Sequence, residues 1–216
     1  MFRLEKLFLD KEVFPLYLQL YFYNVDYFCM KTDFIQQTHF IGVLVPEDIR
    51  ATLEDCRRYM NEAYGCKSGY GTPIHVTLVP PFHLPEEFST KDLAMAIEKE
   101  VILAGNELKF DGHIENFDAF GDRTIFAKVI PNENWTKLRD KVIGAVLKAA
   151  PGCTKKDKRP FTPHLTVANR DIPSGASVAA LQVMNELNLV EDFPVDNVAI
   201  FERRGGKWNV AWCGEM

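Results

Sequence analysis

The chain has few cysteines, and their arrangement excludes two common uses of this residue. Its 216 residues include five cysteines, which are scattered and never spaced as C-x-x-C. An odd, dispersed set argues against a disulfide framework and against a structural zinc site. We therefore expect a protein of a reducing compartment, located in the cytoplasm, without a bound metal.

Long hydrophobic runs are also missing. The most apolar stretch, residues 14–25, is interrupted by polar residues such as Gln19 and Asn24, and is too short and too polar to span a bilayer. Asp10, Lys11 and Glu12 interrupt the segment that would form the apolar core of a signal peptide. We expect a protein that is soluble and has no membrane partner.

An excess of positive charge is absent as well. Lys and Arg number 25 against 30 Asp and Glu, so the formal net charge is −5. Such a chain has no general positive field to hold a long DNA duplex by phosphate contacts, so any nucleic-acid contact must be local. With 47% hydrophobic and 25% charged residues the composition is that of an ordinary globular protein. The length predicts one domain, or two small lobes that share a core.

The first 29 residues differ in composition from the rest. They contain nine Phe and Tyr, far above the density of the remaining chain. One interpretation is an N-terminal extension that packs its aromatic side chains on the main domain or on a partner. The other is translation from an upstream start, with Met30 as the natural beginning. We predict an aromatic-rich extension over residues 1–29 and a main domain over residues 30–216.

Apolar periodicity and turn residues predict a repeating order of elements from His39 onward. We expect strands at 40–45, 74–79, 108–120, 124–130 and 164–168, helices at 46–64, 90–104, 132–150 and 177–187, and a closing hairpin at 195–201 and 208–212. Pro80 and Pro81 should end the second strand and turn the chain away before His83. The same order recurs after residue 120, which predicts an α+β protein of duplicated β-α-β-α-β units in two lobes, about 39–120 and 121–216.

Two short motifs carry the strongest functional signal. They are His75-Val76-Thr77-Leu78 in the first half and His164-Leu165-Thr166-Val167 in the second. On a strand, the two-residue period places each His and its Thr on one face, about 7 Å apart, while the apolar residues point into the core. A single such motif is more often part of a core strand. Two at corresponding positions of two half-repeats indicate a shared polar site.

Paired histidines suit chemistry on a phosphodiester. An imidazole titrates near pH 6.5, so at neutral pH one His can accept a proton from an attacking hydroxyl while another donates one to the departing oxygen. A Thr hydroxyl beside each His can donate a hydrogen bond to the phosphate oxygens as their charge grows. The residues thus predict acid–base catalysis that requires no metal. The glycine pairs lack the pattern of a phosphate-binding loop, so we expect no nucleotide cofactor.

On these residues the sequence resembles the two-histidine (2H) phosphoesterase superfamily, which includes bacterial 2'-5' RNA ligases and RNA 2',3'-cyclic phosphodiesterases. The resemblance covers about residues 39–212 and is carried by the segments 75–82 and 161–170. It implies a bilobal α+β fold whose antiparallel sheets face a central cleft. It also implies metal-independent opening of a 2',3'-cyclic phosphate, and in some members reversible 2'-5' RNA ligation.

The resemblance assigns roles to the motif residues. His75 would be the proton donor and His164 the proton acceptor, with Thr77 and Thr166 beside them. The RNA ligase branch often has an Arg soon after the first motif, whereas this chain has Val-Pro-Pro-Phe at residues 79–82. That departure leaves the exact substrate open.

Five further residues are candidates for substrate binding. Arg170 could pair with a phosphate, or be solvated or paired with Asp171. Lys158, in the basic run of residues 155–159, could follow an RNA backbone, or lie on a solvated loop. Phe82 and Tyr70, and also Phe161, could stack on a base, although aromatic residues near core strands are usually core.

The other three histidines, His39, His83 and His113, have no Thr two residues later. We expect surface or local hydrogen-bonding roles for them.

The function predicted from the sequence is that of a monomeric phosphodiesterase acting on an RNA terminus or a small cyclic nucleotide. One alternative is a module that binds a nucleotide or RNA without turnover, which would not need two acid–base histidines. Another is a scaffold whose segment 1–29 docks a partner or a membrane face; its net charge gives no attraction to anionic lipid.

Overall fold

The computed structural model describes residues 36–156 and 159–216. Residues 37–216 form one compact unit. The predicted extension at residues 1–29 lies outside the described residues. No helix among the described residues is long and apolar enough to cross a membrane.

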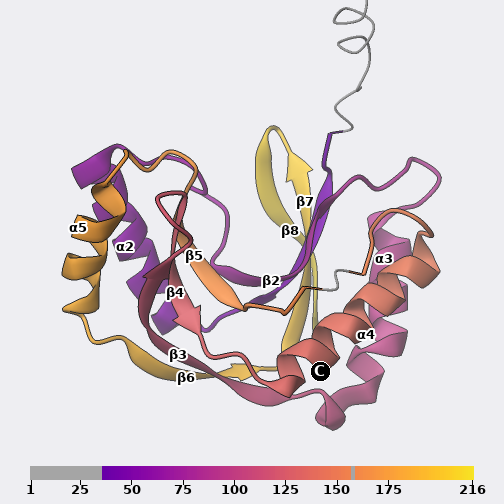
Figure 1. Ribbon diagram of the computed structural model, residues 1–216. Coiled ribbons are helices and arrows are strands. Elements are labelled where there is room, and N and C mark those ends of the chain that lie inside the picture. Colours follow the sequence, from indigo (N-terminus) through magenta and orange to yellow (C-terminus); the bar gives the residue numbers. More distant parts are fainter. Residues whose placement is uncertain (1–35, 157–158) are drawn as a thin grey trace, which may run out of the picture. The chain divides into compact units, whose positions relative to one another are not determined.

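Eight strands form a single sheet, in the order β6-β3-β4-β5-β2-β1-β7-β8, and every neighbouring pair is antiparallel (Figure 1). The strands are β1 (His39–Leu44), β2 (His75–Phe82), β3 (Phe110–Ala119), β4 (Thr124–Val129), β5 (His164–Asn169), β6 (Val190–Val195), β7 (Asn197–Arg204) and β8 (Lys207–Glu215). The predicted α+β class with antiparallel strands is confirmed. Its two halves meet where β5 pairs with β2.

The helices pack in two pairs on the two halves of the sheet (Figure 1). They are α2 (Glu47–Tyr64), α3 (Thr90–Glu100), α4 (Glu133–Ala149) and α5 (Ala176–Asn185), with a 3-10 turn η1 (Ile102–Glu107) after α3. In α3 a capping box forms between Ser89 and Asp92, and the Asn132 side chain caps α4. The apolar faces that the periodicity predicted, such as Leu53 and Met60 of α2, are fully buried.

The chain crosses repeatedly between the two halves of the sheet. The strand β3 precedes residue 120 but pairs with β4 and β6, while β7, from the end of the chain, pairs with β1. The helix α2 packs on β5, and α4 packs on β2. Each half of the sheet therefore draws elements from both sides of residue 120, and the expected division at that residue is not a boundary in space.

Two local expectations were wrong. The strand β2 continues through Pro80 and Pro81 to Phe82, which pairs with His39. The register of β1 shifts opposite these prolines, and a shifted segment tolerates residues that lack an N–H. The strand β6 was not identified from the sequence. It is an edge strand whose exposed side chains and Pro194 hide the alternation typical of strands.

Candidate active site

The two motifs lie side by side at the centre of the sheet. Their strands β2 and β5 are antiparallel, with Val76 opposite Leu165. This register places His75 across from Thr166 and Thr77 across from His164. Directly opposed residues have Cβ atoms about 5 Å apart. We call these four side chains the quartet: each histidine faces the threonine of the other motif.

The quartet occupies one face of the sheet, and the core lies on the other. Val76, Leu78, Leu165 and Val167 are buried in the main core. The quartet opens into a cavity of about 490 Å³, which all four of its side chains line. We call it the catalytic cavity after the role that the sequence predicts for the quartet. The two-residue period of each strand therefore places the polar quartet and the apolar residues on opposite faces of the sheet, as the motifs predicted.

Both imidazoles are held in the same way. The Nδ1 atom of His75 lies 2.7 Å from the carbonyl oxygen of Pro73, and Nδ1 of His164 lies 2.9 Å from that of Thr162. Because a carbonyl can only accept, each Nδ1 carries a proton and donates it. In the neutral ring this leaves the Nε2 lone pair free to act on a substrate.

Aromatic rings pack against each imidazole. The ring centroids of Phe40 and Phe201 lie 4.6 and 4.9 Å from that of His75. Those of Phe120 and Phe126 each lie 5.2 Å from that of His164. The orientation of both imidazoles is therefore constrained by packing as well as by the Nδ1 hydrogen bonds.

A glycine on β1 provides the space for the first imidazole. A Cβ atom at Gly42 would lie 2.6 Å from the carbonyl oxygen of Val76 and 3.3 Å from Cδ2 of His75. Strand β1 therefore cannot carry a side chain at this position without displacing β2 or the ring.

The two histidines differ in their electrostatic surroundings. Burial lowers the pKa of His75 to about 4. The Pro73 carbonyl opposes this, and the positive charge of Arg57, and that of His164 when it is protonated, add to it. Burial also lowers the pKa of His164, against the effect of the Thr162 carbonyl. Both rings are therefore neutral at pH 7 in the free protein.

Arg57 is a site residue that the sequence analysis missed. It lies on α2, is 7% exposed, and donates hydrogen bonds to the carbonyl oxygens of Thr166, at 3.0 Å from Nη2, and Thr72. Burial lowers the pKa of its guanidinium to about 10, so it stays charged at pH 7. The available signal was a charged residue directly after Cys56, within the apolar face of the helix.

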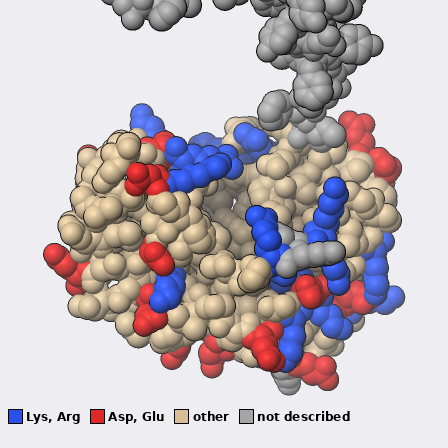
Figure 2. Space-filling view, viewed as in Figure 1, with Lys and Arg blue, Asp and Glu red and all other residues tan. Residues whose placement is uncertain are grey.

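The catalytic cavity is positively charged although the protein is acidic overall. Arg57, Lys67, Arg170 and Lys207 line it, and no acidic residue among the described residues does. Figure 2 shows a hollow in this face with Lys and Arg side chains near its rim. A cavity of this charge favours anionic ligands such as phosphates.

The match to a protein-family model decides the family. The model of the 2'-5' RNA ligase superfamily matches residues 45–207, which include both motifs. The chain belongs to the 2'-5' RNA ligase superfamily. No curated protein sequence matches the chain.

Solved structures share the fold of this superfamily member. TT0787 of Thermus thermophilus is 22% identical, with a TM-score of 0.56 over 82% of this chain and 97% of that protein. Escherichia coli LigT, solved with 3'-AMP, is 15% identical, with a TM-score of 0.56 over 83% of this chain and 98% of LigT. A structure described as a phosphoesterase is 17% identical, with a TM-score of 0.53 over 83% and 99% of the two chains.

Two further residues predicted from the sequence, Arg170 and Tyr70, also lie at the catalytic cavity. Arg170 lines it, with a backbone φ of +75°, and Tyr70 lines it with half of its surface exposed. Asp171 does not pair with Arg170; its carboxylate accepts the backbone N–H groups of Lys67 and Ser68 at 2.6 and 2.7 Å. Asp171 thereby attaches the loop that carries Tyr70 to the end of β5.

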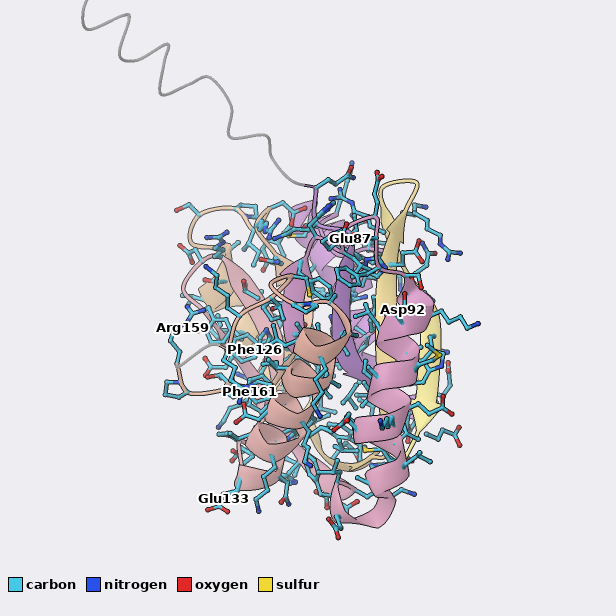
Figure 3. All side chains as sticks on the ribbon, turned by 90° about the vertical axis from the view of Figure 1, so that its right-hand side faces the viewer. Glu87, Asp92, Phe126, Glu133, Arg159 and Phe161 are labelled. Atoms are coloured by element: carbon cyan, nitrogen blue, oxygen red, sulfur yellow. The ribbon has the colours of Figure 1, made fainter. Side chains whose placement is uncertain are left out.

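Two other aromatic candidates, Phe82 and Phe161, do not line the catalytic cavity. Phe82 is 5% exposed, does not line the cavity, and has its ring 6.0 Å from that of His39. Phe161 packs beside α4, with the guanidinium of Arg139 4.8 Å from its ring (Figure 3). Lys158 lies outside the described residues.

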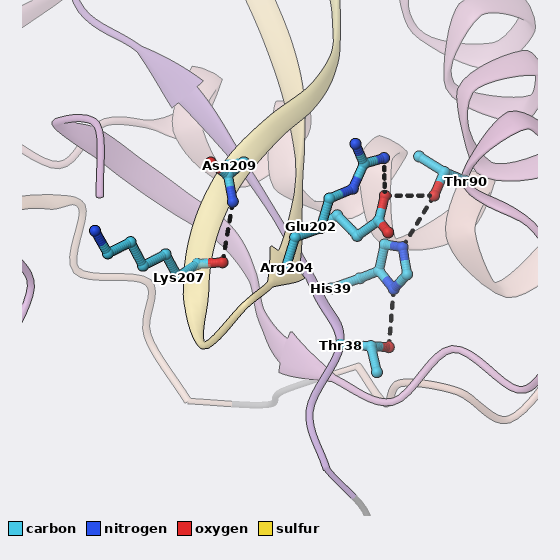
Figure 4. A network of polar contacts seen from close by, with 7 residues as sticks. All are labelled: Thr38, His39, Thr90, Glu202, Arg204, Lys207 and Asn209. Atoms are coloured by element: carbon cyan, nitrogen blue, oxygen red, sulfur yellow. Dashed lines mark hydrogen bonds and ion pairs between the residues drawn. The ribbon is translucent and has the colours of Figure 1, made fainter. Parts of the chain in front are cut away.

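The remaining histidines form local contacts. His39 is buried rather than on the surface: its Nδ1 lies 2.9 Å from Oγ1 of Thr38, and its Nε2 lies 3.1 Å from Oγ1 of Thr90, which contacts Glu202 (Figure 4). His113 lies 2.6 Å from the Asp192 carboxylate. Among the described residues no cluster of three or more His, Cys, Asp or Glu could hold a metal ion.

Proposed function

We propose that the protein opens 2',3'-cyclic phosphates at RNA ends or on small nucleotides by metal-independent acid–base catalysis. The observation that carries the proposal is the quartet, with two imidazoles whose Nε2 atoms are free, in a cavity lined by four cationic residues. With a 5'-hydroxyl in place of water as the nucleophile, the same ring opening would break the bond from phosphorus to the 3' oxygen and form a 2'-5' linkage.

The step balances with the residues of the quartet. One Nε2 removes a proton from water as the water oxygen bonds to phosphorus. The bond from phosphorus to one ribose oxygen breaks. The other histidine, neutral in the free protein, would take up a proton when the anionic phosphate binds beside it, and it gives this Nε2 proton to the departing oxygen. The hydroxyls of Thr77 and Thr166 donate hydrogen bonds to the non-bridging oxygens, whose charge the cations offset. The product is one phosphomonoester. LigT, which shares the fold, was solved with 3'-AMP, a compound of this class.

The surroundings of the histidines favour an assignment of their roles. Arg57 lies behind Thr166, which faces His75, so its charge opposes a proton on His75. We infer that His75 is the acceptor in ring opening and His164 the donor, the reverse of the order that the resemblance implies. An aryl phosphodiester separates these roles, because nitrophenolate leaves without protonation. His164→Ala should retain far more activity on this substrate than His75→Ala; the opposite result would restore the other order.

The test of the function uses an RNA oligonucleotide that ends in a 2',3'-cyclic phosphate, with EDTA present. His75→Ala and His164→Ala should each lower turnover by at least about a hundredfold, the contribution typical of general acid–base catalysis. His113→Ala, which removes a histidine outside the cavity, is the matched control. Resolving 2'- from 3'-phosphates identifies the bond that breaks.

Two results would contradict the proposal. Folded His75→Ala and His164→Ala variants with native turnover would refute two-histidine catalysis. Tight binding of the RNA by the native protein, with no turnover, would favour the alternative of a binding module.

A further inference from the structure

A second cavity adjoins the catalytic cavity. Its volume is about 360 Å³, and it lies between α2 and the loop of residues 70–73 that leads into β2. Arg57, Tyr70 and Thr72 line both cavities, so they form a common wall. A ligand in the catalytic cavity can therefore extend past this wall into a second binding space.

The second cavity is also positively charged. Arg50, Arg57 and Arg58 line it against one carboxylate, that of Glu54. The side chains of Arg50 and Arg58 are 41% and 57% exposed, and their partners are acidic residues of α2 one turn earlier. Exposed ion pairs of this kind contribute little to stability, so both guanidiniums can reorient toward a ligand. A guanidinium can bind a phosphate group through two parallel hydrogen bonds.

An exposed aromatic side chain stands at the border of the two cavities. Tyr70 is 52% exposed, and it is flanked by Gly69 and Gly71, whose φ angles are +86° and +81°. These left-handed conformations favour glycine and let the loop present the ring to solvent. Successive unpaired bases bind proteins by stacking on exposed aromatic rings. The position of Tyr70 fits a base between two phosphate-binding spaces.

We propose that the second cavity binds the nucleotide that precedes the terminal cyclic phosphate of an RNA chain. Its phosphodiester would contact Arg50 and Arg58, and a base would stack on Tyr70. The inference rests on the proposed function and deepens it, because it names the substrate class as single-stranded oligonucleotides rather than mononucleotides.

Binding to the native protein tests this proposal without turnover. The probes are a trinucleotide with a 3'-phosphate and a nucleoside 3'-monophosphate, each measured by calorimetry. The trinucleotide should bind more tightly, and its affinity should fall more steeply with salt because it makes more phosphate contacts. In the double variant R50Q/R58Q its affinity should fall at least about tenfold, the loss expected if only one charge-assisted hydrogen bond were removed, while mononucleotide affinity stays within about twofold.

Matched variants sharpen the test. Glu54→Gln removes the carboxylate of the second cavity and should tighten trinucleotide binding alone. Lys137→Gln removes one cation from an exposed pair with Glu133 on α4 and should change neither affinity. If R50Q/R58Q does not fold, Arg58→Gln alone serves, because its side chain is more than half exposed.

The outcomes separate this inference from the proposed function. Equal affinity for the two probes, or an equal effect of R50Q/R58Q on both, would overturn the second binding space. Selective loss of trinucleotide binding supports it whether or not the protein turns over cyclic phosphates. Absence of turnover with that selectivity intact would refute only the proposed hydrolysis.

Discussion

Replacing Arg57 with Met should destabilise the fold and raise the pKa of His75. The guanidinium donates hydrogen bonds to the carbonyl oxygens of Thr166 and Thr72. Leaving a buried acceptor unpaired costs about 1–3 kcal/mol, and relief of the buried charge offsets part of the cost for two acceptors. We expect a loss of about 3 kcal/mol, or roughly 6–12 °C in Tm for a domain of this size.

The titration of His75 provides the second readout. In the native protein its NMR signals should titrate near pH 4, and in Arg57→Met the midpoint should move up, because a positive charge that opposes protonation is gone. Arg57→Lys keeps the charge but not the forked geometry, so it should keep the low midpoint while losing part of the stability. Arg58→Met, the loss of an exposed neighbour, is the control.

Two outcomes would refute this reasoning. An unchanged Tm in Arg57→Met would show that the hydrogen bonds to the two carbonyls do not stabilise the fold. An unchanged titration of His75 would show that the charge of Arg57 does not add to the effect of burial on the pKa of His75.

Three other variants test the packing, the titration and the loop of the site. Gly42→Ala should lower activity and cost about 1–3 kcal/mol of stability in urea unfolding, because the new Cβ would lie 2.6 Å from a carbonyl oxygen of β2. Gly144→Ala on α4 is the control: its Cβ would meet no atom of the described residues within 4 Å, apart from the adjoining backbone of α4, so neither activity nor stability should fall. The pKa of His75 is about 4 in the folded protein and 6.5 in the unfolded chain. The unfolded chain therefore takes up a proton first as the pH falls from 6.5 to 4, which lowers the free energy of unfolding by up to about 3 kcal/mol. Urea titrations at a series of pH values should show a smaller decline of this free energy in His75→Gln. Asp171→Ala releases the loop of residues 67–71 and should raise KM severalfold with kcat retained; a fall in kcat alone would contradict this.

The quartet was predictable because strand geometry is local. A period of two places His75 with Thr77 and His164 with Thr166, and apolar neighbours fix which face is buried. The pairing of β2 with β5 brings each histidine opposite the threonine of the other motif. This pairing is a long-range contact, and only the resemblance to a known family pointed to it.

The missed features depend on tertiary context. Arg57 reads as an ordinary helical cation until the carbonyls of Thr166 and Thr72 are placed beside it. Phe82 reads as a residue after a turn, because two prolines usually end a strand, but a shift in the register of β1 accommodates them. In both cases the partner lies on another element, so neither composition nor spacing indicates it.

The two halves of the site are alike in their motifs and unlike in what lies behind them. Counted from the first residue of each helix, Arg57 of α2 corresponds to Ile143 of α4, which is 2% exposed. The buried arginine of α4, Arg139, lies over the ring of Phe161 instead. Of the two corresponding positions, only the one on α2 places a buried cation behind the sheet, and that cation opposes a proton on His75. Acid–base catalysis by two identical groups requires surroundings that separate their pKa values. The double variant Arg57→Ile/Ile143→Arg moves the arginine from α2 to α4. It should raise the pKa of His75 and lower that of His164, and histidine NMR titrations would show whether the two pKa values move in these directions.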